Sequence, residues 1–385
     1  MSTLTFTEDQ TELYEFARAF ADERIDLAAI RRAEETKTFP SELWDALSDA
    51  GLHGLSVPKE YGGAGGGIVE QSIVEEQLGR QLGGLATLWS INTHSASTLA
   101  RHGTEEQRKT ILPAMAEGRH RIALSFTEPG GGTDVLGALR TRARKVNGGY
   151  VLNGSKAFTT MAADCHQLLV LARTSDGERK HHGLTMFLID ADRKGIEHQR
   201  IPTMGHESFG TFNVFYEDVK VSPSEVIGVA DRGWDCLKGT INHERVIIAA
   251  CCTGTIRGVT DRAVAYAKDR EAFGRPIGQF QAIQHYIADM EISYQAARLM
   301  TYHAADLAAA DKEYALESAV AKAYASEACS KAADMAIQIL GGAGYTKDHD
   351  VERMWRDTRI MRIGPISNEM VRNYVAEHLG LPRSF

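Results

Sequence analysis

The sequence predicts a mainly α-helical protein with a β-domain in the middle of the chain. Residues 1–121 and 233–385 carry apolar side chains at helical spacing, and the second of these segments is rich in alanine. Residues 122–232 instead hold short runs of β-branched and aromatic residues, separated by Asn-Gly, Asp-Gly and Lys-Gly. We therefore expect an N-terminal helical domain, an antiparallel β-domain and a C-terminal helical bundle, divided at these boundaries.

Length and composition indicate a globular protein with more than one core. A chain of 385 residues is expected to form two or three domains. Its net charge of −8 argues against a nucleic-acid partner. The five cysteines lack Cys-x-x-Cys spacing, and the N-terminus lacks the basic and apolar regions of an export signal. No apolar run approaches the roughly 20 residues that span a bilayer, so we expect a cytoplasmic protein with no membrane partner. We also expect no metal site.

The N-terminal segment predicts a series of helices. Thr7 can cap the first one, which continues with Leu13 and Phe16 at helical spacing. Further helices are expected over residues 41–52, 68–82 and 85–102, and another from Thr104 onward. The helix over 85–102 is unusually polar between residues 90 and 97. One interpretation is a helix that packs through its Leu and Ala residues and leaves a polar face in solvent.

The middle and C-terminal segments differ in the spacing of their hydrophobic residues. Short strands are expected over residues 150–153, 168–172, 184–189 and 212–216. Long helices are expected over residues 243–258, 259–272, 281–307 and 313–340. The many alanines of these helices allow close packing in a bundle.

One glycine-rich stretch follows the first apolar run of the middle segment. Residues 124–134 read Leu-Ser-Phe-Thr-Glu-Pro-Gly-Gly-Gly-Thr-Asp. Pro129 cannot donate an N–H group, and the three glycines leave the backbone open to a ligand. With the oxygens of Thr133 and Asp134, the segment can present polar groups to a flat ring or a phosphate. An ordinary turn uses the same residue types, so the spacing alone leaves both interpretations open.

This stretch resembles the flavin-binding signature of the acyl-CoA dehydrogenase family, Thr-Glu-Pro-x-Ala-Gly-Ser-Asp, with Gly131 at the Ala position and Thr133 at the Ser position. A second segment, residues 154–160, reads Gly-Ser-Lys-Ala-Phe-Thr-Thr and resembles the family's Gly-x-Lys-x-Trp-Ile-Thr. The resemblance implies FAD as the cofactor, with Phe158 against the flavin and the Thr160 hydroxyl directed to flavin N5. Taken alone, Phe158 would be interpreted as a buried strand residue.

Two further segments resemble those that complete the FAD site from a neighbouring subunit. Residues 270–281 read Arg-Glu-Ala-Phe-Gly-Arg-Pro-Ile-Gly-Gln-Phe-Gln, and residues 338–342 read Gln-Ile-Leu-Gly-Gly. The resemblance places Arg270 at the pyrophosphate, where a guanidinium suits the charge, and the second segment at the adenine half. Taken alone, each is a helix C-cap or a solvated Arg. The resemblance implies a homo-oligomer, with a tetramer favoured over a dimer. The FAD contacts that it implies are Leu124, Ser125, Thr127, Gly132, Thr133, Phe158, Thr160, Arg270, Phe273, Gln281, Gln338, Gly341, Gly342, Ser367 and Glu369.

The resemblance also bears on the catalytic base. Removal of the proton next to a thioester needs a carboxylate, which the family usually supplies in Tyr-Glu-Gly-Thr. This chain has Gly-Pro-Ile-Ser at 364–367, and Pro365 cannot be a base. A branch that resembles isovaleryl-CoA and long-chain dehydrogenases supplies the Glu from an earlier helix, just before an Arg. That pattern implies Glu244 as the base and Arg245 as a substrate contact, together with Thr133. Taken alone, Glu244 is a solvated charge at a helix start.

The resemblance as a whole implies α,β-dehydrogenation of an acyl-CoA, with hydride transfer to flavin N5 and electrons passed to an electron-transfer flavoprotein. It also implies that the helix over 85–102 walls the acyl pocket. The family holds the thioester oxygen with a backbone N–H at this position, which Pro365 lacks. Three alternatives stay open: the Ile366 N–H holds the oxygen, the loop is displaced, or another group donates the hydrogen bond. Alternative functions are action on an acyl carrier protein, elimination without net oxidation, a catalytically silent scaffold, and a DNA-binding relative, which the acidic charge balance disfavours.

Overall fold

The structure is a computed structural model that describes residues 6–238 and 240–383. It consists of helices, short 3₁₀ turns, one eight-stranded sheet and a two-stranded sheet, in agreement with the expected fold class. Its contacts define two compact units that each draw on separate parts of the chain. The first comprises Met1–Ile25, Gly67–Thr87 and Asn242–Phe385, and the second comprises Asp26–Gly66 and Leu88–Ile241. The division into three segments by chain order stays a prediction.

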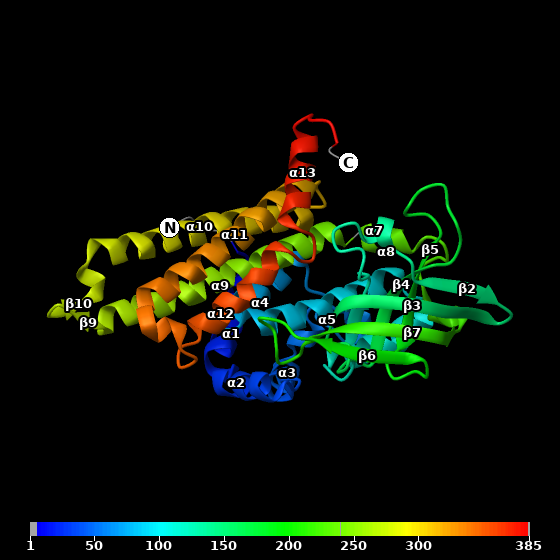
Figure 1. The fold of residues 1–385 in the computed structure, drawn as a ribbon, viewed down its shortest axis with the longest axis horizontal. Coiled ribbons are helices and arrows are strands. Elements are labelled where there is room, and N and C mark those ends of the chain that lie inside the picture. Colours follow the sequence, from blue (N-terminus) through cyan, green and yellow to red (C-terminus); the bar gives the residue numbers. More distant parts are fainter. Residues whose placement is uncertain (1–5, 239, 384–385) are drawn as a thin grey trace. The chain divides into compact units, whose positions relative to one another are not determined.

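The first unit is mainly helical, and the long helices α9, α10 and α11 lie side by side in it (Figure 1). Thr7 caps α1 through a reciprocal pair of hydrogen bonds with Gln10, as expected. The elements are α1 (Glu8–Arg24), α4 (Ile68–Gln81), the start of α5 (Gly83–His102), α9 (Ile241–Asp269), β9 (Glu271–Ala272), β10 (Arg275–Pro276), η4 (Ile277–Gln279), α10 (Gln281–Ala309), α11 (Ala315–Leu340), η5 (Gly341–Tyr345), α12 (Val351–Thr358), η6 (Arg359–Arg362) and α13 (Asn368–His378).

Helix α9 is continuous, so the expected break after Gly258 is wrong. Gly254 and Gly258 lie inside α9 where α4 crosses it. A Cβ on Gly254 would lie 1.8 Å from the Glu76 carbonyl oxygen, and one on Gly258 would lie 1.9 Å from the Arg80 carbonyl oxygen. The two glycines therefore permit a close helix crossing and do not end a helix.

The second unit is built on an eight-stranded sheet with the order β6-β7-β3-β2-β4-β5-β8, and β1 pairs with β4. The β1–β4 pairing and a single β2–β4 pair are parallel, and the other pairings are antiparallel. The strands are β1 (Ile122–Ser125), β2 (Arg142–Val146), β3 (Gly149–Thr160), β4 (Gln167–Arg173), β5 (Leu184–Asp190), β6 (Ile196–Ile201), β7 (Thr211–Val221) and β8 (Val226–Ile227). Strands β3, β4, β5 and β7 contain the four expected ones.

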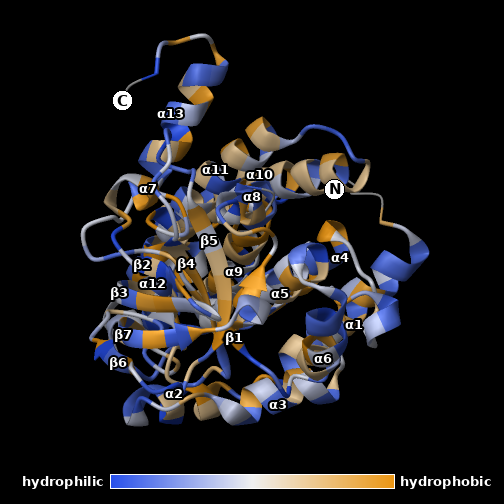
Figure 2. Cartoon of the chain, turned by 90° about the vertical axis from the view of Figure 1, so that its right-hand side faces the viewer, coloured by the Kyte–Doolittle hydropathy of each residue, from blue (hydrophilic) through white to orange (hydrophobic). Residues whose placement is uncertain are grey.

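Helices and 3₁₀ turns complete the second unit, and the central strands carry hydrophobic side chains (Figure 2). They are α2 (Leu27–Thr36), α3 (Ser41–Asp49), η1 (Leu52–Gly54), η2 (Lys59–Tyr61), the remainder of α5, α6 (Glu105–Ala116), α7 (Val135–Ala138), η3 (Pro223–Glu225) and α8 (Gly233–Lys238). Over the ranges 6–238 and 240–383, no helix has the length and hydropathy to cross a membrane.

The polar side of α5 is buried, so the expected solvent-exposed face is wrong. Asn92, Thr93 and Ser95 are each at most 3% exposed. The side-chain oxygen of Asn92 accepts the Ile122 N–H, and the Ser95 hydroxyl donates to the Ile91 carbonyl. The Asn92 hydrogen bond therefore joins α5 to β1, and the Ser95 hydroxyl is satisfied within its own helix.

Candidate functional site

The glycine-rich loop after β1 is anchored by Glu128. Its carboxylate accepts the N–H groups of Arg140 (2.6 Å) and Thr141 (2.9 Å) and pairs with the Lys156 ammonium at 2.9 Å. Burial lowers the pKa of Lys156 to about 8. Burial alone would raise the pKa of Glu128, but the charge of Lys156 and the hydrogen bonds hold it below its ordinary value. The pair is therefore ionised at neutral pH and fixes the start of the loop.

Beyond this anchor the loop is open to solvent. Gly130, Gly132 and Thr133 are exposed, and a Cβ on either glycine would meet no atom within 4 Å. Gly132 has a φ of +40°, which favours glycine. Asp134 ends the loop by accepting the Gly137 N–H at 2.9 Å. The exposed backbone and hydroxyl are thus available to a ligand.

A bulge in β3 turns Phe158 outward beside this loop. The register of β3 against β7 shifts between Lys156 and Thr159, and Phe158 adopts a φ of +57°. Such a conformation costs a non-glycine residue ~1–3 kcal/mol and occurs mostly at functional sites. The ring is 61% exposed, which contradicts a buried strand residue. The neighbouring Ala157 N–H donates to the Thr127 carbonyl (2.8 Å), so loop and ring are held together.

The other predicted residues of this segment are less accessible. Ser125 is buried, and its hydroxyl lies 2.8 Å from the Tyr216 hydroxyl and 3.2 Å from that of Thr159. Its side chain therefore serves the sheet. Leu124, Thr127 and Thr160 are partly buried.

In the first unit, Glu244 lies in the first turn of α9. Burial raises the pKa of Glu244 to about 7, against the opposing influence of the Arg245 and Lys322 charges. Arg245 is itself buried, donates to the Asn242 side-chain oxygen (3.1 Å) and lies over the Tyr374 ring, 5.3 Å from its centroid. A partly buried carboxyl group that titrates near neutrality is suited to proton abstraction.

The segment before α13 carries the other predicted residues of this region. Ser367 caps α13 by accepting the Met370 N–H, and Glu369 is exposed in its first turn. The Ile366 carbonyl oxygen accepts the Lys322 ammonium at 2.6 Å. We did not expect Lys322 from the sequence. The sequence feature that could have indicated Lys322 is a single cation on the apolar side of an alanine-rich helix.

Arg270 lies at the opposite end of α9 from Glu244. They are 26 residues apart, so at ~1.5 Å per residue the separation is ~39 Å. Phe273 is 96% exposed at the tip of the β9–β10 hairpin, and Gln281 is exposed at the start of α10. Gln338, Gly341 and Gly342 are exposed where α11 ends. Glu244 and Arg270 of one chain are therefore remote from each other.

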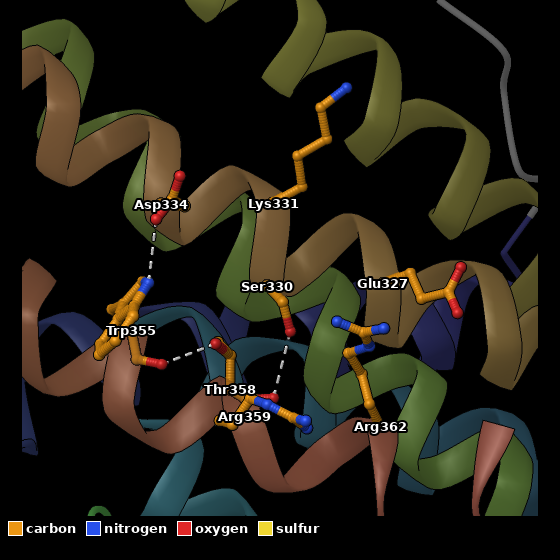
Figure 3. A pocket seen from close by; sticks show the side chains of 8 residues that line it. All are labelled: Glu327, Ser330, Lys331, Asp334, Trp355, Thr358, Arg359 and Arg362. Atoms are coloured by element: carbon orange, nitrogen blue, oxygen red, sulfur yellow. Dashed lines mark hydrogen bonds between the residues drawn. The ribbon is translucent and has the colours of Figure 1, made fainter.

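A surface pocket of about 310 Å³ lies between α11, α12 and η6 (Figure 3). Its two acids are engaged, since Glu327 pairs with Arg372 and Asp334 accepts the Trp355 N–H. The lining residues are Glu327, Ser330, Lys331, Asp334, Trp355, Thr358, Arg359 and Arg362. None of the predicted site residues lines this pocket.

The chemistry of the predicted set fits FAD. The second unit offers an exposed aromatic ring at Phe158, an open glycine backbone at Gly132 and a hydroxyl at Thr133. The first unit offers an exposed guanidinium at Arg270 and open glycines at the end of α11. Stacking, backbone N–H groups and a cation are what a flavin and a pyrophosphate require.

Comparisons with known proteins cover most of the chain. The acyl-CoA dehydrogenase N-terminal, middle and C-terminal domain models match residues 7–119, 123–219 and 231–380. Caffeyl-CoA reductase-Etf complex subunit CarC of Acetobacterium woodii is 35% identical over 93% of this chain and 94% of its own length. Mitochondrial isovaleryl-CoA dehydrogenase of Oryza sativa is 33% identical over 98% of this chain and 93% of its own length.

Solved structures show the same similarity. Butyryl-CoA dehydrogenase from Megasphaera elsdenii matches with a TM-score of 0.92 and 29% identity, over 98% of this chain and 100% of the other. An FAD complex of PigA matches with a TM-score of 0.92 and 26% identity, over 98% of this chain and 99% of the other.

Proposed function

Because this chain belongs to the acyl-CoA dehydrogenase family and is an FAD-dependent oxidoreductase of CH–CH bonds, we propose that it desaturates an acyl-CoA thioester with Glu244 as the base. The observation that carries this assignment is the partly buried Glu244 carboxyl, whose pKa burial raises to about 7. Pro365 stands where the family usually has its base, so the proton acceptor must come from elsewhere. FAD, when bound, supplies the hydride acceptor at flavin N5.

The other predicted residues bind and orient the substrate and the cofactor. Glu244 removes the proton next to the thioester carbonyl, and its partial burial keeps it basic at neutral pH. Arg245 holds the substrate beside Glu244, and its own position is fixed by Asn242 and Tyr374. Phe158 and Thr160 would face the flavin, while Thr133 would contact both the cofactor and the thioester end. The open loop would supply backbone N–H groups to the cofactor.

The protein acts as a homo-oligomer, with a tetramer favoured over a dimer. The ~39 Å along α9 between Glu244 and Arg270 supports this proposal, because a cofactor that lay beside Glu244 would be far from the Arg270 of the same chain. Arg270, Phe273, Gln281 and Gln338 then complete the site of a neighbouring subunit.

An electron-transfer flavoprotein takes up the electrons in this proposal. The supporting relative is the caffeyl-CoA reductase subunit, whose name places it in an Etf complex. That relative is named a reductase, so the same groups serve either direction of the CH–CH reaction. Mixing experiments with an electron-transfer flavoprotein and reduced enzyme test this step.

The deciding experiment is an anaerobic titration of the FAD-loaded protein with butyryl-CoA, isovaleryl-CoA and 3-arylpropanoyl-CoA, following flavin absorbance. Bleaching by one thioester establishes the reaction and its substrate class. Glu244→Gln should keep FAD and lose bleaching, and near-normal bleaching would place the base elsewhere. Absence of bleaching in the wild type would favour a carrier-protein substrate or a non-redox role.

A further inference from the structure

The buried cation Lys322 connects α11 to the segment that precedes α13. Its side chain is fully buried, and its ammonium donates to the Ile366 carbonyl oxygen (2.6 Å) and the Asn368 side-chain oxygen (2.7 Å). Asn368 is held in turn by Ser326 (3.0 Å) and Glu327 (3.2 Å). Both acceptors of the ammonium are neutral, so these hydrogen bonds do not cancel its charge.

The charged groups that act electrostatically on Lys322 belong to two other helices. They are Glu244 and Arg245 on α9 and Glu369 on α13, together with the Cys252 thiol of α9. The groups that act on Glu244 are Arg245 and Lys322. The Lys322 ammonium thus lies between α9, which carries the proposed base Glu244, and the Gly364–Ser367 segment, which stands where the family usually has its base.

Stability alone does not account for a lysine here. A buried cation without a hydrogen-bonded carboxylate is costly, and apolar replacements of buried charges are often neutral or stabilising. The neighbours of Lys322 along α11 are alanines, so an apolar side chain would suit the helix. Burial lowers the pKa of Lys322 to about 8, which leaves it charged at neutral pH.

We propose that Lys322 is a positioning residue that holds the Gly364–Ser367 segment against α11 and maintains a positive charge beside Glu244. The second role rests on the proposed function of Glu244. Without the charge, the carboxylate of Glu244 is less stable and its pKa rises. Without the hydrogen bonds, the segment around Pro365 loses its anchor.

The charge is tested with Lys322→Gln, which keeps a donor for the Ile366 carbonyl but removes the charge. Flavin reduction is measured from about pH 5.5 to about pH 9.5 with the acyl-CoA that bleaches the wild type, and the matched control is Lys331→Met, an exposed lysine of the same helix. In Lys322→Gln we expect the midpoint of the pH profile to rise by about one unit. At pH values well below the midpoint, flavin reduction should then be about tenfold slower than in the wild type. The control should keep the wild-type midpoint. A lower rate with an unchanged midpoint would overturn the electrostatic role.

The anchor is tested with Lys322→Met, which removes both charge and donor. Hydrogen exchange of residues 360–368 should become at least tenfold faster in Lys322→Met and stay near wild type in Lys322→Gln. Equal protection in all three proteins would overturn the anchoring role, and if Lys322→Met does not fold, Asn368→Ala removes half of the anchor and should give an intermediate rate. Because exchange does not depend on the chemistry, this result stands even if Glu244→Gln shows that the base lies elsewhere.

Discussion

The Lys156 ammonium lies 2.9 Å from the Glu128 carboxylate, and both side chains are withdrawn from solvent. Lys156 also donates to the Phe126 carbonyl at 3.0 Å. The two residues are 28 positions apart in the chain. This pair therefore fixes the glycine-rich loop to the strand segment that carries Phe158, and it sets how the two motifs meet a ligand.

Removing one member of this pair should be costly. Glu128→Ala leaves a buried ammonium without its partner, and we expect a loss of ~3–5 kcal/mol in the free energy of unfolding. The measurement is denaturant unfolding, with the exposed Glu197→Ala as the control. The double variant Glu128→Leu with Lys156→Met should regain much of the stability but not FAD affinity. A single variant as stable as the control would show that the pair is unimportant.

Glu244→Gln should separate cofactor binding from chemistry. The amide cannot accept the substrate proton, so we expect flavin reduction to fall ~10²–10⁴-fold while the FAD content stays at the wild-type value. Stopped-flow absorbance after anaerobic mixing measures the rate. The exposed Glu313→Gln, on a loop before α11, should behave as the wild type. A reduction rate within a few-fold of wild type would exclude Glu244 as the base.

The same substitution should stabilise the fold at high pH. Burial raises the pKa of Glu244 from 4.5 to about 7, so the folded state binds the proton more tightly than the unfolded state. The wild type therefore loses stability as pH rises from 4.5 through 7, and Glu244→Gln does not. At pH 8 the variant should be more stable by on the order of 2 kcal/mol, and at pH 4.5 the two should be equal. Thermal unfolding across this range provides the check, and a difference that does not vary with pH would contradict it.

Phe158→Ala should weaken FAD binding without lowering stability. The ring is largely exposed and its backbone is strained, so its removal costs little packing. Phe158→Gly should even raise the free energy of unfolding by about 1 kcal/mol, because glycine accepts a positive φ. FAD retention during gel filtration and denaturant unfolding are the measurements. Phe215→Ala, an exposed phenylalanine of β7, should leave FAD retention intact.

Gly254→Ala should be strongly destabilising despite its small size. The new methyl group would lie 1.8 Å from the Glu76 carbonyl oxygen, so α4 and α9 must move apart. We expect a loss of several kcal/mol, in the range that marks overpacking of a core. Gly130→Ala, where no atom lies within 4 Å, is the matched control for thermal unfolding. Equal melting temperatures would show that the crossing tolerates a side chain.

Local signals in the sequence determined much of this protein. The capping box at Thr7, the helical periodicity of 68–81 and the β-rich runs at β4 and β5 each depend on neighbours in the chain, and the structure confirms them. Helix α2 and strands β2 and β6 were not predicted, because they are short and mixed in polarity. The resemblance of five short motifs, each local, identified the family and its cofactor.

Other properties depend on which segments pack together, and only the tertiary structure decided them. Gly258 lies where α4 crosses α9 and does not end the helix, because α4 packs against it. The polar side of α5 is buried against β1, where the Ile122 N–H donates to the Asn92 side-chain oxygen and the Ile122 carbonyl accepts the Ser95 hydroxyl. The raised pKa of Glu244 and the buried ammonium of Lys322 arise from desolvation by helices far apart in sequence. Desolvation and close contact are set by three-dimensional neighbours, which no spacing along the chain specifies.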